Sequence, residues 1–459
     1  MKLFVQFHSF DLPRPMPSKF PHTLLIIIIF IVLAGVCTYV LPQGEYERRY
    51  DEATRREAVV PGSYHEVNAS PLSAFQILVA IPRGIVAGGE VIALIFLVGA
   101  CFYVVEKTGA LREGMVLLTE RLKGREEITL ILTGLFFLIG GALEGMEEEV
   151  IPLIPVLILL TRRLGYDPFV MVGTSYGSTV IGASFSPLNP FGAVTAQKIA
   201  GVPFLSSGTF QLVVLIVAFS LWMMLMIRYG SKNRIPVMTD GASSTGETSL
   251  ANRVILAIVG LAFVILIVGL MNWGWSFNEM GAEFFVVAVL AGLIGKLGWN
   301  GTFSAYAEGL KEMTFASLIV GFAHGISLVL MDGKILDTII YGLFIPMEGL
   351  PATLSAVGMM MSQFALHVVV PSYAGQAVLT IPILAPLSDL IGLSRQVCVL
   401  AFQYGAILMN MLSPTNGALM AILALSGIRY DQWLNFAIRR LMFIFILCIV
   451  VLVTASFLL

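Results

Sequence analysis

The stretch "SPLNPF", residues 186–191, decides the fold of this chain because it interrupts an otherwise apolar run. Between Phe169 and Gln197 the sequence contains no Asp, Glu, Lys or Arg. Pro187 and Pro190 lack an N–H group and obstruct the preceding helical turn, so a helix must open here. The opening releases carbonyl and N–H groups, and the neighbouring Ser and Asn side chains are suitable local partners for them. The stretch therefore predicts a membrane helix that is broken near its middle.

The same interruption occurs a second time near the end of the chain. "YGSTVIGASFSPLNPFGAVTAQKIAG" (176–201) matches "YGAILMNMLSPTNGALMAILALSG" (404–427), and "IPLIPVLILLTRRLG" (151–165) echoes "IPILAPLSDLIG" (381–392). Helix ends at two matching breaks would meet near the membrane midplane. Their N-termini can face anionic groups and their C-terminal carbonyls can bind a cation.

Composition sets the class of protein. The 459 residues are 57% hydrophobic and only 12% charged, against about 25% charged in soluble domains. Apolar blocks of about 20 residues are long enough to cross a bilayer, so we expect an all-α integral membrane protein in the lipid bilayer. The net charge of −2 and the lack of a basic stripe argue against nucleic acid. No phosphate loop, metal-spaced cysteine set or nucleophile triad is present, so we expect a protein that is not an enzyme and has no cofactor.

Two pairs of short apolar runs are predicted to be re-entrant hairpins, which enter and leave the membrane on one side. The positive-inside rule supports this prediction, because clusters of Lys and Arg flank the first pair on both sides. It also places the N-terminus in the cytoplasm, and the membrane is expected to be the cell inner membrane. This gives about ten transmembrane helices and two hairpins. Because a linking helix separates the halves, the second half begins on the opposite side of the membrane. The halves are therefore expected to be inverted-topology repeats, as in an elevator-type transporter. Amphipathic stretches at 70–85, 110–123 and 301–312 are expected at the membrane interfaces.

The predicted organisation divides the chain at its polar segments. Its parts are a cytoplasmic N-terminus (1–19), repeat 1 (20–227, with hairpin 128–161 and broken helix 169–200), a cytoplasmic linker (228–253), a linking transmembrane helix (254–272) and repeat 2 (280–459, with hairpin 352–392 and broken helix 396–426).

The tip of the first hairpin, "EGMEEE" (144–149), is the only carboxylate cluster in the apolar part of the chain. Charged groups at membrane depth are costly and usually functional, so the tip is a candidate site for sodium, a proton or a solute cation. Glu148 and Glu149, next to the following helix, are the preferred candidates. Glu144 and Glu147 best fit the alternative that the tip is solvated.

The tip of the second hairpin, "PSYAGQ" (371–376), is neutral and offers Ser372, Gly375 and Gln376 as binding groups. His324 and His367 lie in apolar runs. Packing is the preferred role for both histidines, with proton transfer as the alternative.

"GMEEEVIPLIPV", "VVPSYAGQAVLTIPILAPLSDLIGLSRQ" and "LSPTNGALMAILALSGI" resemble the DcuC/YfcC family, the anaerobic C4-dicarboxylate carrier group of the ion-transporter superfamily. The likeness covers about residues 20–459. It implies a homodimer, an elevator-type motion of the hairpins and broken helices, and coupling to a cation. It also implies binding residues at the tips and breaks, with a possible Na+ site near Asn189, Asn416 and Glu148. These implied binding residues are Ser186, Asn189, Ser372, Gln376, Ser413, Thr415 and Asn416.

The sequence thus predicts a cation-coupled (Na+ or H+) secondary active transporter or exchanger. Its small-molecule substrate is an amino-acid or peptide-like metabolite or a C4-dicarboxylate. No Arg or Lys lies at the breaks or tips, which slightly favours a solute with an ammonium group. Two alternatives remain. A channel would need a continuous polar pore, and an intramembrane enzyme using the Glu-rich hairpin tip would need a nucleophile and a positioned base.

Overall fold

The structure is a computed structural model that describes residues 23–51, 56–111, 113–114, 125–145, 147–236, 249–269, 273, 275–344 and 350–459. The expected cytoplasmic N-terminus (1–19) lies outside the described residues. So do residues 237–248 of the expected linker, residues 112 and 115–123 of the predicted amphipathic stretch 110–123, and residues 270–272 of the expected linking helix.

The first half of the chain consists of helices, short 3-10 or π-helical segments (η) and four short strands. Its helical elements are α2 (Thr23–Val40), α3 (Ala74–Ala87), α4 (Gly89–Lys107), α6 (Glu126–Glu144), η1 (Glu148–Leu153), α7 (Ile154–Arg163), α8 (Pro168–Val172), η2 (Gly173–Gly177), α9 (Ser178–Phe185), η3 (Pro190–Val194), α10 (Thr195–Ala200) and α11 (Gly208–Lys232).

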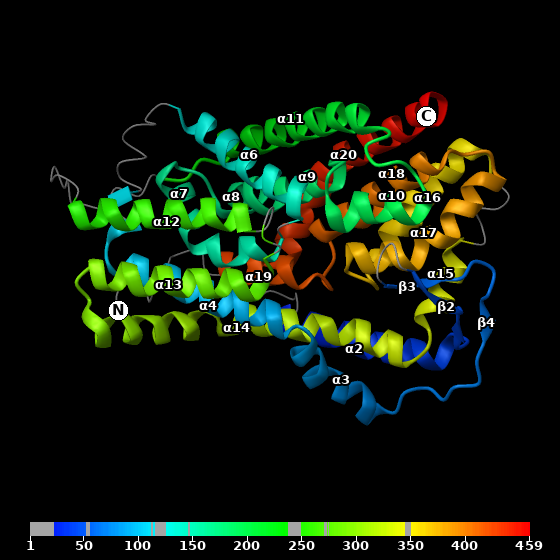
Figure 1. Ribbon diagram of the computed structural model, residues 1–459, viewed down its shortest axis with the longest axis horizontal. Helices are drawn as coiled ribbons and strands as arrows, with labels where there is room; N and C mark the ends of the chain where they lie inside the picture. Colours follow the sequence, from blue (N-terminus) through cyan, green and yellow to red (C-terminus); the bar gives the residue numbers. More distant parts are fainter. Residues whose placement is uncertain are drawn as a thin grey trace.

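The second half follows a similar order. Its helical elements are α12 (Leu250–Val268), α13 (Phe277–Ile294), α14 (Gly298–Asp332), α15 (Leu336–Phe344), α16 (Ala352–His367), α17 (Tyr373–Leu390), α18 (Arg395–Leu408), η6 (Met409–Met411), α19 (Gly417–Ser426) and α20 (Tyr430–Leu458). Figure 1 shows α11 and α14 on opposite edges of the molecule, with α8, α9 and α19 between them.

Six helices in the described part of the chain are long and apolar enough to cross a membrane: α4, α6, α11, α13, α14 and α20. Four further apolar stretches, in α2, α3, α12 and α19, are shorter: Leu24–Val40, Ala74–Ala87, Leu250–Leu266 and Gly417–Ser426. A mostly helical fold with several candidate membrane spans is therefore confirmed. The expected number of ten spans stays a prediction.

Equivalent helices pack together in the two halves. The first arm of each predicted hairpin lies along the helix that precedes a break: α6 along α9, and α16 along α18. A Cβ atom on Gly182 would lie 2.2 Å from the carbonyl oxygen of Leu138, and one on Gly405 would lie 2.2 Å from that of Met360. Both crossings therefore bring the backbones too close for any side chain larger than glycine.

The second arms cross over between the halves. α7 packs against α19 of the second half, and α17 packs against α10 of the first half. Such reciprocal pairing is what a repeated unit predicts. It buries Asn189 and Asn416 at the breaks and Glu147 and Gln376 at the tips.

The location of the amphipathic stretches at the membrane interfaces stays a prediction, and the structure shows only how two of them pack. Residues 301–312 are the first part of α14, a single helix about 52 Å long. Residues 70–85 lead into α3, which joins α4 through Gly88 alone; both helices pack along α14. In α3 only Ala80 and Gly84 are buried, whereas Phe75, Leu78 and Val86 stay exposed.

Four short strands were missed by the all-α prediction. β1 (Gly44–Glu45) pairs with β4 (His65–Glu66), and β2 (Arg48–Asp51) pairs with β3 (Arg56–Val59), both antiparallel. They lie beside α15 at one end of the molecule (Figure 1), and β3 also contacts α17. Strands of two to four residues are too short to show a clear alternating pattern.

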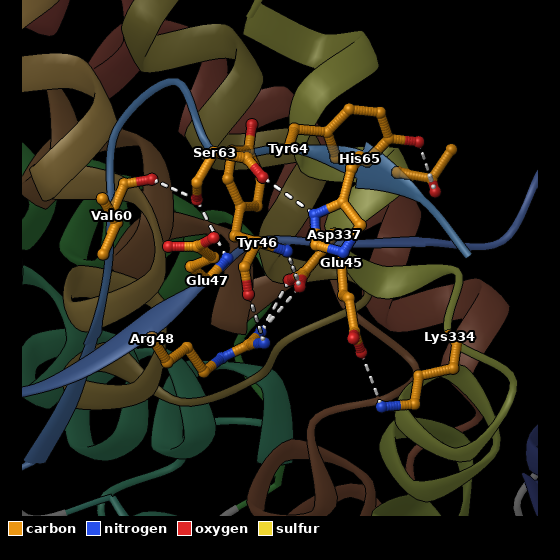
Figure 2. A network of polar contacts seen from close by, with 11 residues as sticks. Glu45, Tyr46, Glu47, Arg48, Val60, Ser63, Tyr64, His65, Lys334 and Asp337 are labelled. Carbon is orange, nitrogen blue, oxygen red and sulfur yellow. Dashed lines mark hydrogen bonds and ion pairs between the residues drawn. The ribbon is translucent and has the colours of Figure 1, made fainter.

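Charged side chains fix these strands to the end of α14 and to α15 (Figure 2). Arg48 Nη2 donates to both carboxylate oxygens of Asp337 at 2.8 Å, and the backbone N–H of Tyr46 donates to the same carboxylate at 3.0 Å. Lys334 Nζ lies 2.8 Å from Glu45 Oε2, and this contact lowers the pKa of Glu45. The beginning of the first half is thereby attached to the second half.

Candidate functional site

The first broken segment opens where its prolines predict, between Phe185 and Pro190. Asn189 caps the following turn: its Oδ1 accepts from the N–H groups of Phe191 at 3.0 Å and Gly192 at 2.8 Å. Its Nδ2 donates to the carbonyl of Gly141 on α6 at 3.2 Å. Every polar atom of the Asn189 side chain thus binds backbone, as the released N–H groups require.

Ser186 has the same kind of role at this break. Its Oγ donates to the carbonyl of Ala142 at 2.6 Å and accepts from the N–H of Leu188 at 3.0 Å. The Ser186 carbonyl accepts from Gln403 Nε2 at 2.9 Å, which links the break to α18. The first break is therefore fixed to the end of the first hairpin arm.

The second broken segment has a matching arrangement. Asn416 Oδ1 accepts from the N–H of Leu419 at 2.7 Å and caps α19. Ser413 Oγ lies 2.5 Å from Thr415 Oγ1, which donates to the carbonyl of Val368 at 2.7 Å. In both halves a hydroxyl group at the break binds a carbonyl at the end of the first arm of its own hairpin.

Two tryptophans accommodate carbonyls near the irregular turns. Trp222 Nε1 on α11 donates to the carbonyl of Gly173 at 2.8 Å, where the π-helical segment η2 begins. Trp433 Nε1 on α20 donates to the carbonyl of Met411 at 2.7 Å, where η6 ends. Buried carbonyls need such partners, so the last helix of each half supports the interrupted segment.

The first hairpin tip brings one carboxylate between the two halves. Gly145 ends α6 with φ at 65°, a left-handed conformation that suits glycine, and the chain reverses there. Glu147 follows and is only 4% exposed, so the alternative that this residue is solvated is wrong. The reversal at Gly145 carries it into the interior. The structure does not describe the Glu144 side chain.

Glu147 is held by amide groups of the second half. Asn410 Nδ2 lies 3.0 Å from Glu147 Oε1 and 2.9 Å from Oε2. Asn416 Nδ2 lies 3.4 Å from Oε2, and the Tyr176 hydroxyl lies 3.5 Å from the same atom. Hydrogen bonds to an ionised carboxylate are stronger than neutral ones, so this set favours a carboxylate.

The second hairpin tip joins the same network. His367, at the end of α16, contacts Asn410 Oδ1 through Nε2 and Gln376 Oε1 through Nδ1, both at 2.6 Å. Asn410 Nδ2 also donates to the hydroxyl of Tyr373 at 2.6 Å. Gln376 Nε2 donates to the carbonyl of Gln363 at 2.9 Å and to its side-chain oxygen at 2.5 Å.

The predicted site residues divide into four groups. Gln376 and Asn416 belong to the network around Glu147, and Ser186, Asn189, Ser413 and Thr415 cap the breaks beside it. Ser372 is an exposed cap of α17 that accepts from the N–H of Gly375 at 3.3 Å. Glu148 and Glu149 begin the 3-10 helix η1 and are half-buried, and Glu147 takes the position that was expected for them.

Four members of the network were missed: Tyr176, Gln363, Tyr373 and Asn410. Asn410 is an amide within the apolar run "AILMNML", and Tyr176 begins the repeated Tyr-Gly, so both left a signal. The predicted Na+ site near Asn189, Asn416 and Glu148 stays a prediction. Both asparagines use Oδ1 as a helix cap. Among the described residues, no group of three or more His, Cys, Asp or Glu side chains could hold a metal ion.

Fold and site together define a multi-pass membrane protein in which two interrupted helices surround a buried carboxylate. The sequence model of the family described as "C4-dicarboxylate anaerobic carrier" matches residues 20–457. The chain belongs to this DcuC family, which confirms the resemblance and makes it a membrane carrier.

Two relatives align with the chain over most of their length. One is the "putative basic amino acid antiporter YfcC" of Escherichia coli, 30% identical over 486 residues that span 95% of this chain and 96% of the relative. The other is an uncharacterized protein of Haemophilus influenzae, 27% identical over 475 residues that span 91% and 93%.

Two solved transporters also align with the chain. They are MtrF of Neisseria gonorrhoeae (96% of each chain) and YdaH of Alcanivorax borkumensis (94% and 98%), each with a TM-score of 0.42 and 15% identity. A likeness at this level is too low to support a structural argument.

Proposed function

We propose that this carrier is a cation-coupled secondary transporter or exchanger, and that its solute has a cationic group which docks at Glu147. The observation that supports this most is the chemistry of the Glu147 site. A buried carboxylate faces amide and hydroxyl donors, and in the described part of the chain no Lys or Arg bonds to it. A solute cation would supply the missing opposite charge.

An amino-acid or peptide-like solute with an ammonium or guanidinium group fits this site better than a C4-dicarboxylate does. A dianion would face the carboxylate of Glu147 and would have only helix N-termini and neutral donors for its own charges. The name of the Escherichia coli relative points the same way, whereas the family description names dicarboxylates. The coupling cation is Na+ or H+.

The test uses purified full-length protein in proteoliposomes. Uptake of labelled L-arginine and of labelled succinate is measured under imposed Na+ and pH gradients, with a thermal-shift screen of amino acids, dipeptides and dicarboxylates beside it. We expect saturable, gradient-dependent uptake of the cationic amino acid, lost in Glu147→Gln and retained in Glu312→Gln, a substitution at an exposed position of α14.

Three results would contradict the proposal. Uptake of succinate without uptake of L-arginine would identify a dicarboxylate as the solute instead. Single-channel conductance would favour a channel, and product formation in detergent would favour an intramembrane enzyme.

We also propose the assembly and orientation that the family resemblance implies: a homodimer in the inner membrane, with a cytoplasmic N-terminus and elevator-type movement. Mass measurement in nanodiscs tests the dimer, and reporter fusions at the N-terminus test the orientation. The long helices α13 and α14, with α2, α3 and α4 along them, suit a static scaffold, and the hairpins and breaks suit the moving part.

A further inference from the structure

We propose that His367 is an imidazolium when no solute is bound, and that its extra proton is the coupling ion. The positive charge would balance Glu147 through the amide of Asn410. This inference rests on the proposed function, in which a solute cation docks at Glu147, and it names the ion that moves in exchange.

The first step of the argument concerns the amide of Gln376. Its Nε2 has two hydrogens, and they go to the carbonyl of Gln363 at 2.9 Å and to the Gln363 side-chain oxygen at 2.5 Å. A backbone carbonyl can only accept, so the orientation of this amide is fixed. Gln376 therefore presents Oε1 to His367 Nδ1, and that nitrogen must donate.

The second step concerns the amide of Asn410. Its Nδ2 also has two hydrogens, which go to the Glu147 carboxylate and to the Tyr373 hydroxyl. An ionised carboxylate is an acceptor only, so Asn410 presents Oδ1 to His367 Nε2 at 2.6 Å. Both ring nitrogens of His367 thus face oxygen acceptors, and an imidazole can donate from both only when it is positively charged.

The third step concerns the balance of charge. Burial disfavours an imidazolium, whereas two hydrogen-bonded acceptors and a nearby carboxylate favour it. The ring of Tyr373 lies stacked on the imidazole, with 5.7 Å between centroids, and a ring face also attracts a cation. These effects oppose one another, so the proton of His367 depends on whether the charge of Glu147 is already balanced.

The neighbouring titratable groups support this assignment. In the described part of the chain, the titratable groups that contact His367 or the neighbouring Asn410 are Tyr373 from α17, Glu147 from the first hairpin tip and Tyr176 from η2, whose hydroxyl donates to the Asn410 backbone carbonyl. The helices α15, α18 and α20 also pack against α16 or its neighbours, and they direct Asp337, Tyr404 and Arg440 to other partners.

Exchange follows from this arrangement. A solute cation that docks at Glu147 takes the place of the Asn410 N–H group and balances the carboxylate. The freed amide can turn and offer Nδ2 to His367 Nε2, which then acts as an acceptor. His367 releases that proton to water and becomes neutral, so one cation enters the site as one proton leaves.

The main experiment reads the charge of His367 directly. Full-length protein with 15N-labelled histidine is examined in nanodiscs by solid-state NMR at pH 7.5, without added solute. Comparison with His367→Asn assigns the signal among the five histidines. We expect two protonated ring nitrogens in the wild type and one in Glu147→Gln, with the wild-type result unchanged in the control His324→Asn. A neutral imidazole in the wild type would overturn the inference, as would an imidazolium that persists in Glu147→Gln.

A second measurement avoids dependence on the folding of the Glu147 variant. L-arginine is added to wild-type protein in weakly buffered detergent, and proton release is followed with a pH indicator. We expect about one proton released per solute bound, and affinity that rises about tenfold per pH unit. Both effects should vanish in His367→Asn and persist in His324→Asn. Binding without proton release would overturn the inference.

The two proposals can fail separately. A neutral His367 together with gradient-driven uptake would leave the proposed function standing and remove this inference. An imidazolium at His367 without any uptake or binding of cationic amino acids would support the charge of His367 and contradict the proposed function. The NMR measurement needs no transported solute, so it decides the charge of His367 in either case.

Discussion

The two broken segments share a plan and differ in what their amides bind. At the first break, the side chains of Asn189 and Ser186 bind only backbone groups of their own half. At the second, Asn416 caps a helix in the same way but also reaches Glu147, and Asn410 Nδ2 donates to that carboxylate as well as to Tyr373. Two matching breaks therefore support an asymmetric site: the first half supplies the charge, and the second supplies the amide groups that bind it.

The largest effect on transport is expected from Asn410→Leu, which keeps the branched side-chain shape and removes the amide. Glu147 would lose a donor to both of its oxygens, and His367 and Tyr373 would lose a partner. Loss of about 3 kcal/mol from a buried charge-assisted contact predicts uptake about 100-fold lower. Initial rates in proteoliposomes measure this. Met409→Leu is the control, and equal uptake by both variants would contradict the asymmetry.

Asn416→Ala and Asn189→Ala compare the two breaks directly. Each removes a helix cap, so each should lower stability by about 1 kcal/mol, read as similar shifts in thermal melting. Only Asn416→Ala also removes a contact with Glu147, and we expect uptake about tenfold below that of Asn189→Ala. If the Asn189 variant has the greater transport defect at equal folded amounts, the first break has a functional role that its contacts do not reveal.

Trp222→Phe and Trp433→Phe test the part of the plan that the halves share. Each substitution leaves one buried carbonyl without its indole N–H, at a cost of about 1 kcal/mol. We expect equal losses of thermal stability. A loss confined to one variant would show that the two supports are not equivalent.

The smallest effect, on thermal stability, is expected at the short strands β1–β4. Lys334→Met removes the contact with Glu45, an exposed pair whose contribution is below about 1 kcal/mol. The pKa of Glu45 is lowered in the folded protein, so this contribution is present above its usual value of 4.5 and is lost as the pH falls. The difference in melting temperature between wild type and variant should therefore be greatest near neutral pH and shrink on acidification. A difference that grows in acid would refute this assignment.

Local sequence predicted the breaks well because proline acts on its own helix. Pro187 and Pro190 lack an N–H group wherever the chain lies, so helices must end near them. The first hairpin could also be predicted from the sequence, because a polar tip separates two short apolar runs. The position of Glu147 was not, because three consecutive glutamates look alike until the turn at Gly145 decides which of them faces inward.

Asn410 and His367 show more clearly the limit of prediction from sequence. Either side chain could have been a satisfied packing residue in an apolar helix, and packing was the preferred role of the histidine. What distinguishes them is the orientation of two amides, set by acceptors 13 residues away in one case and 263 in the other.

By itself, the sequence determined that this chain lies in a membrane and that two matching segments each contain an interrupted helix. These features follow from hydrophobic length and backbone chemistry, which act over a few residues. Only the tertiary structure decided which carboxylate is buried, which amides hold it and which histidine joins them. The reason is physical: burial and hydrogen bonding depend on what other segments bring to the same point in space.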